Sequence, residues 1–257
     1  MCKEDLLWLI KYLKNENDEY KNLKIPKDEE DRFYLYRALV NIREPKEISS
    51  EYLKREDKLL KEVADNKGIV SIDNIENISK NLYLYKGDIT LLECDGIVNA
   101  ANSGMLGCFY PNHKCIDNAI HTFAGVRLRL KCSEIINEQG HPEATGKAKI
   151  TPAYNLPSKY ILHTVGPIVR EELTKRNISD LKSCYSECLT LAKKYKLESI
   201  AFPCISTGEF CFPNKEAAKI ALDVICKFLK DNDMKIIINI FKDADYQIYK
   251  DLAKKKY

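Results

Sequence analysis

The rhythm of apolar residues beyond Leu82 constrains the fold more than any other feature of this sequence. From there on, short apolar runs of strand length alternate with longer segments of helical period. The predicted strands are Leu82 to Tyr85, Gly96 to Ala100, Lys149 to Ala153, Tyr160 to Val165, Ser199 to Pro203 and Lys235 to Phe241. The predicted helices run from about Cys115 to Asn137, Asp180 to Tyr195, Asn214 to Leu229 and Asp243 to Lys255. Strands that alternate with helices predict an α/β fold, a mixed α/β/α sandwich whose functional site lies in loops at the strand ends.

The first 80 residues have a different character. Only Gly68 of the ten glycines lies there, and apolar residues recur at helical spacing in three segments. Asp31 is a candidate N-cap of the second helix, and Pro45 ends it. Ser49 or Ser50 opens the third helix. We therefore expect a small helical N-terminal extension over residues 1–80 and one α/β domain over residues 81–257.

The charge balance excludes one large class of partner. Lys and Arg number 41 against 38 Asp and Glu, and a net charge of +3 is far below the basic excess of a protein that binds nucleic acid by neutralising phosphates. No run approaches the roughly 20 apolar residues of a membrane span, and the chain start lacks the pattern of a signal peptide. The ten cysteines lie mostly in apolar runs and are expected to be reduced. We expect a cytoplasmic protein without nucleic-acid or membrane partners.

Two stretches that follow predicted strands carry hydrogen-bonding groups that a packed core does not require. In residues 87–90, Asp88 can accept from an exocyclic amine, but by itself this pattern favours a turn and a helix N-cap. Asn99 and Asn102 leave the end of an apolar run three residues apart. An amide offers both donor and acceptor, which suits a sugar diol, yet Asn also populates turns, and the spacing does not decide between the two.

A third stretch gathers metal-ligand chemistry. Cys108, His113 and Cys115 fall within eight positions, and two thiolates with one imidazole form a donor set that zinc prefers. Buried free cysteines are common, but this segment is predicted to be a loop, which favours metal binding. Three protein ligands leave a fourth position open, as in catalytic zinc sites. Asp117 and His121, four residues apart, then share one face of the following helix, where a carboxylate can act as base or as dipole partner.

The fourth stretch, residues 204–213, connects a strand to a helix. Its small hydroxyl and glycine residues let several backbone N–H groups point into one concavity, which suits a diphosphate. It matches no general phosphate-binding motif. Phe210 and Phe212 can wall a sugar pocket, although aromatic residues near a helix start more often belong to the core.

Taken together and in this order, these segments resemble the macrodomain family, whose mixed α/β/α fold binds ADP-ribose. The resemblance rests on segments 87–90, 97–103, 145–148, 163–167 and 206–208 followed by Phe212-Pro213. In place of the glycine-rich run of common hydrolytic macrodomains, the chain carries segment 107–115 with its Cys-His-Cys pattern. That replacement is similar to the zinc-dependent macrodomains of bacteria and fungi, which also carry a helical N-terminal extension.

The resemblance implies roles for individual residues. Cys108, His113 and Cys115 would hold Zn²⁺. Asp117 would be the catalytic carboxylate, with Asn102 beside it as a second catalytic residue. The implied substrate-binding residues are Asp88 and Ile89 at the adenine, Asn99 and Asn102 near the distal ribose, Ser206, Thr207, Gly208, Glu209 and Phe210 around the diphosphate, and Phe241 stacked on the adenine.

The implied activity is hydrolysis of the bond between the distal ribose and an Asp or Glu side chain of a mono-ADP-ribosylated protein, releasing ADP-ribose. A sirtuin-type ADP-ribosyltransferase and a small lipoylated carrier protein are the partners that the resemblance suggests. Two alternatives stay open: a reader that binds ADP-ribose without turnover, and an O-acetyl-ADP-ribose deacetylase. A purely structural zinc would need a fourth protein ligand, for which Cys211 is the candidate.

Overall fold

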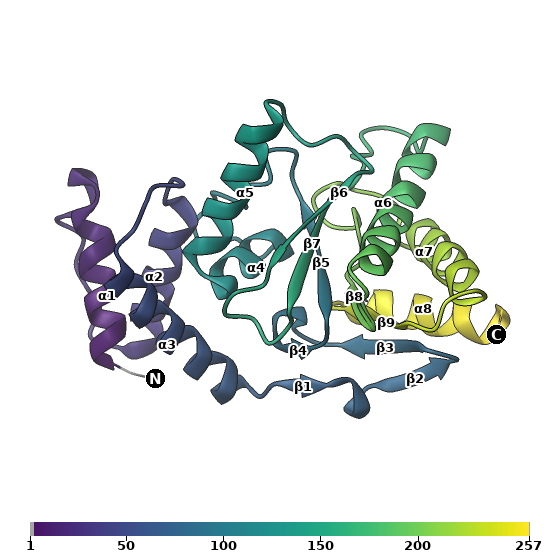
Figure 1. Cartoon of the computed structure of the whole chain (residues 1–257), viewed down its shortest axis with the longest axis horizontal. Coiled ribbons are helices and arrows are strands. Elements are labelled where there is room, and N and C mark those ends of the chain that lie inside the picture. The colour runs from purple at the N-terminus through teal and green to yellow at the C-terminus, as the bar shows by residue number, and fades with distance from the viewer. Residues whose placement is uncertain (1–2, 257) are drawn as a thin grey trace.

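The computed structural model describes residues 3–256, with the backbone alone for 254–256, and shows a three-layer α/β/α sandwich with three helices at one end (Figure 1). The central sheet has seven strands in the order β2-β3-β9-β8-β5-β7-β6. The two outer pairs, β2 with β3 and β6 with β7, are antiparallel, and the inner pairs are parallel. The strands are β2 (Glu76–Ser79), β3 (Leu82–Lys86), β5 (Gly96–Ala101), β6 (Ala148–Pro152), β7 (Tyr160–Val165), β8 (Ser199–Phe202) and β9 (Lys235–Ile240).

Alternation along the inner strands builds the two halves of the core. Neighbouring residues on a strand face opposite sides of a sheet, so Ile97 packs against one helical layer and Val98 against the other. On the Ile97 side lie α4 (Ile116–Ala124) and α5 (Val126–Gln139). On the Val98 side lie α6 (Lys175–Lys194), α7 (Asn214–Leu229) and α8 (Asp243–Lys256). The sandwich predicted from the sequence is confirmed, and none of the described helices combines the length and apolarity that a membrane span needs.

The N-terminal helices have an apolar core of their own. They are α1 (Lys3–Asn15), α2 (Glu29–Ile42) and α3 (Ser50–Lys67), packed around a cluster that includes Leu6 and Leu59. Ser49 caps α3 as expected, its hydroxyl accepting from the N–H of Tyr52 at 3.2 Å. The cap expected at Asp31 is wrong, because Asp28 accepts from the backbone N–H groups of residues 30 and 31 and starts α2 one turn earlier.

The chain between the helical extension and the main sheet holds short strands that its apolar pattern did not predict. β1 (Val70–Ser71) pairs in parallel with β4 (Leu92–Glu93), and β2 pairs with β3 as an edge of the main sheet. The edge strand lies within residues 1–80, so this part of the chain is not wholly helical. Strands of two to four residues are too short to establish a period, which explains why the sequence pattern did not reveal them.

The single long helix expected from Cys115 to Asn137 is wrong, because the chain forms α4 and α5 with a break at Gly125. Gly125 has φ of +89° and ψ of 172°, a conformation that is essentially restricted to glycine. A Cβ there would lie 2.6 Å from Oε2 of Glu56 in α3. The break therefore brings the start of α5 against the helical extension, where Val126 joins the apolar cluster of the three N-terminal helices.

Candidate active site

The loops that carry the predicted site residues meet at one edge of the sheet. Strands β3, β9, β8 and β5 run parallel, so their carboxyl ends lie side by side. Asp88 follows β3, Phe241 follows β9, Ser206 follows β8 and Asn102 follows β5. The β3 and β9 loops are tied together, because the N–H of Gly87 donates to the carbonyl of Ile240 at 3.0 Å. The loops that follow these four strands thus lie side by side at one edge of the sheet.

At the β3–β9 end of this edge, two predicted adenine contacts are available to a ligand. Asp88 uses Oδ1 to accept from the N–H and hydroxyl of Thr90, while its Oδ2 lies 3.8 Å from Nζ of Lys67. Phe241 is 79% exposed, which leaves its ring face free for stacking. Ile89 is buried in the core, so it can meet a ligand through its backbone and not through its side chain.

The two asparagines hold Asp117. Asn99 Nδ2 donates to Oδ1 of the carboxylate at 2.8 Å, and Asn102 Nδ2 donates to Oδ2 at 3.1 Å. Asn99 is itself fully buried, and its Nδ2 lies 3.2 Å from Nδ1 of His163. Asn99 therefore orients the Asp117 carboxylate from within the protein core. Burial raises the pKa of Asp117 to about 6, while Asn99, Arg129 and Asn102 each oppose that rise.

Two buried imidazoles lie behind this carboxylate. His121 Nε2 is 3.6 Å from Oδ1 of Asp117, which confirms that residues 117 and 121 share a helix face. Desolvation lowers the pKa of His121 well below its usual range and that of His163 to about 3, so both rings are neutral. His163 contacts Asn99 and Thr151 through its two ring nitrogens, as expected of a structural histidine.

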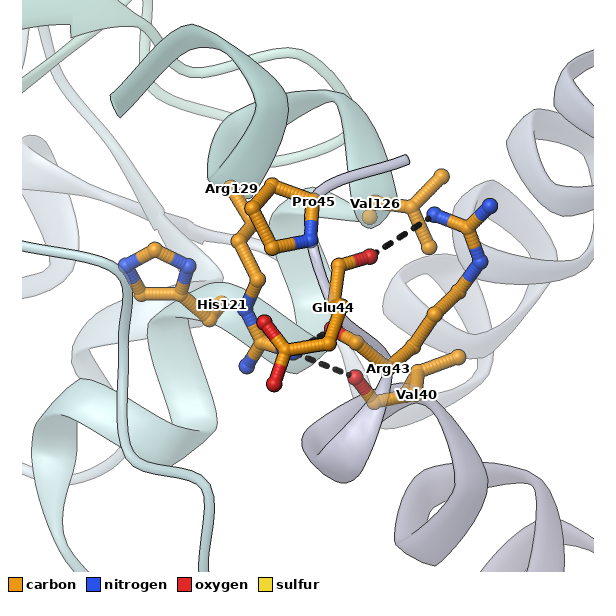
Figure 2. Close-up of a pocket in the computed structure, with 8 residues that line it drawn as sticks. Val40, Arg43, Glu44, Pro45, His121, Val126 and Arg129 are labelled. Carbon is orange, nitrogen blue, oxygen red and sulfur yellow. Dashed lines mark hydrogen bonds between the residues drawn. The ribbon is translucent and has the colours of Figure 1, made fainter. Parts of the chain in front are cut away.

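Arg129 of α5 is the buried cation of the site. Its Nε donates to the carbonyl of Leu106 at 2.6 Å, and its Nη1 donates to the carbonyls of Val40 and Arg43 in the helical extension. Figure 2 shows the Arg129 guanidinium beside the carbonyls of Val40 and Arg43, at a small pocket that His121 also lines. Burial lowers the pKa of Arg129 to about 10, and the charge of Asp117 is the first of the interactions that oppose this fall.

Cys108, His113 and Cys115 form the candidate metal centre. Their ligand atoms all lie within 4.8 Å of one another, at the start of α4. Cys108 Sγ and His113 Nδ1 are 3.6 Å apart. Zinc bonds of about 2.3 Å to sulfur and about 2.0 Å to nitrogen, at a tetrahedral angle, place two such ligands about 3.5 Å apart. The donor set and its spacing therefore fit a zinc ion.

The fourth ligand considered from the sequence is not at this centre. Cys211 is exposed, and among residues 3–256 it belongs to no group of potential metal ligands. Its thiol donates instead to the carbonyl of Glu209 at 3.7 Å. The protein thus offers three ligands from the described residues, which is the number typical of a zinc site with an open position.

The loop after β8 faces the candidate metal centre. Glu209 Oε1 lies 3.8 Å from Nε2 of His113, the ring nitrogen that points away from Cys108. Ser206 adopts φ of +65°, and the loop is closed by a bond from the N–H of Phe212 to the carbonyl of Ser206 at 2.9 Å. The N–H groups of Gly208, Glu209 and Phe210 donate no hydrogen bond within residues 3–256. Thr207 is partly tied, because its hydroxyl donates to the carbonyl of Cys204.

The sequence did not reveal the residues that support the site from a distance. The loops around the candidate metal centre accept hydrogen bonds from, or donate them to, Arg37 and Asn41 of α2, Asn118 of α4 and Arg129 of α5. Arg129 had a recognisable signal, since it lies three residues from both Val126 and Cys132 on the buried face of the predicted helix. Arg37 and Asn41 had none, because their partners lie about 70 to 80 residues away in the chain.

A family model described as the Macro domain matches residues 98–221. Among curated proteins, a "Protein-ADP-ribose hydrolase" from Treponema medium is 47% identical over 256 residues, which are 97% of this chain and 98% of that protein. A protein of the same name from Staphylococcus aureus strain MSSA476 is 45% identical over 253 residues, or 97% of this chain and 95% of its own.

Solved structures give the same family. The Oceanobacillus iheyensis macrodomain with ADP aligns with a TM-score of 0.64 and 40% identity, covering 70% of this chain and 94% of the other. A Trypanosoma brucei macrodomain in complex with ADP-ribose aligns with a TM-score of 0.65 and 29% identity, covering 84% and 94% of the two chains. Because this chain is 40% identical to the Oceanobacillus iheyensis macrodomain and covers 94% of it, the chain belongs to the macrodomain family.

Proposed function

We propose that this macrodomain is a zinc-dependent hydrolase that removes mono-ADP-ribose from Asp or Glu side chains of a modified protein and releases ADP-ribose. The observation that carries the proposal is the convergence of three ligand atoms within 4.8 Å, a few residues from the buried carboxylate of Asp117. The relatives named protein-ADP-ribose hydrolase at 47% and 45% identity support hydrolysis, and the related structures with ADP and ADP-ribose support the ligand class.

The edge of the sheet offers a binding surface for each part of ADP-ribose. Asp88 Oδ2 is the acceptor for the adenine amino group, at the cost of its weak contact with Lys67. The exposed ring of Phe241 stacks on the base. The diphosphate lies in the loop from Ser206 to Phe210, where unpaired backbone N–H groups bind phosphate oxygens. The distal ribose would then lie between that loop and the candidate metal centre, a position supported by the approach of Glu209 to His113.

Cys108, His113 and Cys115 would hold the zinc ion. The ion would supply Lewis-acid chemistry, lowering the pKa of a water molecule and polarising oxygens of the distal ribose. Asp117 orients the attacking water and accepts its proton. Asn99 and Asn102 keep both carboxylate oxygens in place during that step. The water oxygen bonds to the anomeric carbon, the bond to the side-chain oxygen breaks, and the Asp or Glu carboxylate of the substrate leaves.

We also propose two partners and a cytoplasmic location. The small lipoylated carrier protein as substrate, and the sirtuin-type transferase that modifies it, rest on the resemblance of the motifs alone. A cytoplasmic location is supported by the nine described cysteines, which are all free thiols.

The first experiment combines metal content with turnover. Purified protein is assayed for zinc, and release of ADP-ribose from a carboxylate-modified protein is followed before chelation, after chelation and after zinc is returned. We expect about one zinc per chain, loss of turnover on chelation and recovery with zinc. Cys115→Ser should lose zinc and turnover, whereas Cys211→Ser, a cysteine outside the centre, should retain both.

The same experiment separates the alternatives. Turnover unchanged by chelation would remove the metal from the mechanism. ADP-ribose binding and bound zinc without turnover on any modified protein would identify a reader. Turnover on O-acetyl-ADP-ribose but not on modified protein would identify a deacetylase.

A further inference from the structure

The second N-terminal helix, α2, directly contacts the loop that carries Cys108, His113 and Cys115. Arg37, in the middle of α2, donates from Nη2 to the carbonyl of His113 at 3.0 Å. The same guanidinium donates from Nη2 and Nε to Oδ1 of Asn118, at 2.7 Å and 3.2 Å. One side chain of the helical extension thus holds both the backbone of a ligand residue and a side chain at the start of α4.

Asn118 passes this contact on to the rest of the loop. Its Nδ2 donates to the carbonyls of Tyr110 at 3.0 Å and Cys108 at 3.4 Å, and its backbone N–H donates to Sγ of Cys115 at 3.4 Å. Asn118 is fully buried, so these bonds do not compete with solvent. Arg37 and Asn118 together therefore contact the backbone or the sulfur of all three candidate ligand residues.

A second contact from α2 lies one helical turn further along. Asn41 Oδ1 accepts from the backbone N–H of Asn112 at 2.9 Å, immediately before His113. Asn41 Nδ2 donates to the hydroxyl of Thr122 at 2.9 Å, and that hydroxyl donates to the carbonyl of Asn118. Asn112 has φ of +55°, so the chain turns sharply where Asn41 holds it. The two contacts fix the loop on either side of His113.

From these contacts we propose that α2 of the N-terminal extension is part of the metal centre's support, with Arg37 and Asn41 as positioning residues for the Cys108–Cys115 loop. The inference rests on the proposed function, since it concerns the affinity of this loop for zinc. Residues that orient metal ligands through hydrogen bonds typically change metal affinity by about 10-fold to 100-fold when removed. The extension would therefore act on the site itself and would not only cover α4 and α5.

The test measures zinc affinity in the full-length chain. Metal-free protein is titrated with zinc against a chromophoric chelator, and cobalt(II) is used in parallel to observe thiolate coordination by absorption. Arg37→Ala should bind zinc about 10-fold to 100-fold more weakly than the wild-type chain. Arg32→Ala is the matched control, because Arg32 lies on the same helix and its Nε donates to the carbonyl of Pro26 within the extension.

Two further readings keep the result specific to positioning. The unfolding temperature of the metal-free protein and its affinity for ADP-ribose should be the same for Arg37→Ala and Arg32→Ala. Should Arg37→Ala unfold early, Arg37→Lys decides: lysine retains the charge but lacks the planar fork, and it should bind zinc more weakly than the wild-type chain. Asn41→Ala should also weaken zinc binding, and the absorption spectrum of its cobalt(II)-loaded form should differ from that of the wild-type chain.

The outcomes distinguish this inference from the proposed function. If wild-type protein binds zinc, Cys115→Ser does not, and both Arg37 variants bind within twofold of Arg32→Ala, the positioning role is wrong while the hydrolase proposal stands. If the wild-type chain binds zinc no better than Cys115→Ser, the metal centre itself is wrong and the positioning role falls with it.

Discussion

Asp117 shows how single residues define the site. A carboxylate that is 5% exposed needs hydrogen-bond partners, and it has the amides of Asn99 and Asn102, one on each oxygen. His121 beside it is neutral and cannot pair with it as an ion. The carboxylate is therefore fixed in position by neutral donors and not neutralised by a contacting cation, which suits the role proposed for Asp117, to accept a proton from a correctly placed water.

Asp117→Asn should separate catalysis from binding. The amide keeps the size of the side chain but cannot accept a proton, so we expect kcat for ADP-ribose release to fall by about 100-fold to 10,000-fold. Zinc content and the Kd for ADP-ribose should change by no more than a few fold. Asp18→Asn, which alters a mostly exposed aspartate of the extension, serves as control. A turnover rate near that of the control would exclude Asp117 as the base.

At the scale of secondary-structure elements, the break between α4 and α5 matters most to the site. The break lets α4 carry Asp117 and Asn118 next to the Cys108–Cys115 loop, while α5 takes another direction and carries Arg129 toward the extension. Gly125 permits this turn, and the pocket in Figure 2 lies beside it. The geometry of the break thus depends on a backbone conformation that other residues rarely adopt.

Gly125→Ala should destabilise the protein more than the same substitution at a helix end where no atom lies near the added Cβ. Its backbone strain alone costs about 1–3 kcal/mol, and the new Cβ would also displace the Glu56 carboxyl at 2.6 Å. Gly140, which ends α5 with φ of +75°, has nothing within 4 Å of such a Cβ. Gly140→Ala should cost about 1–2 kcal/mol. Chemical denaturation of both variants measures the difference, and equal losses would contradict the close approach at Gly125.

The sequence predicted elements with a strong period and failed where the period is short or interrupted. The strand Tyr160–Val165 and the helix Asn214–Leu229 have the predicted bounds, and the other five strands of the prediction differ by one residue at one or both ends. β1 and β4, with two residues each, carry no period at all. The helical pattern continues on both sides of Gly125, so the pattern alone predicted one helix.

The same distinction holds for the candidate site. Residues close in sequence, such as Cys108 and Cys115, can be grouped by their type and spacing along the chain, and the fold brings their ligand atoms together. Contacts between distant elements had no local signal. Arg37 meets His113 across 76 positions, and Arg129 meets Val40 across 89. Such pairs follow from how the helices pack against one another, which local patterns in a single sequence do not reveal.

At the scale of the whole molecule, the extension and the sandwich share a buried joint. Glu56 of α3 accepts from the N–H of Val126 at 3.0 Å, and thereby caps α5 from another element. Its other oxygen accepts from the hydroxyls of Tyr36 at 2.8 Å and Tyr52 at 3.3 Å. With Arg129 bonded to Val40 and Arg43, this joint links the two parts by buried hydrogen bonds, so we expect them to unfold together.

The Glu56 carboxyl should make the stability of this joint depend on pH. Burial raises its pKa to about 7 from 4.5, so between these values the folded protein holds a proton that the unfolded chain releases. The resulting stabilisation is fully present below pH 4.5 and is lost as pH rises through 7. Between pH 5 and pH 7.5 this group should lower the free energy of unfolding by about 2 kcal/mol.

Glu56→Gln removes that titration. The free energy of unfolding of this variant, minus that of the wild-type chain, should therefore rise by about 2 kcal/mol between pH 5 and pH 7.5. Denaturant unfolding at several pH values, with a chelator present so that no metal contributes, measures this difference. Glu51→Gln is the matched control, because Glu51 lies on the same helix in an exposed ion pair with Arg55. The change of this difference with pH should be larger for Glu56→Gln than for Glu51→Gln. A difference for Glu56→Gln that stays constant with pH would mean that the Glu56 carboxyl is ionised in the folded protein at pH 5, despite its burial at the joint.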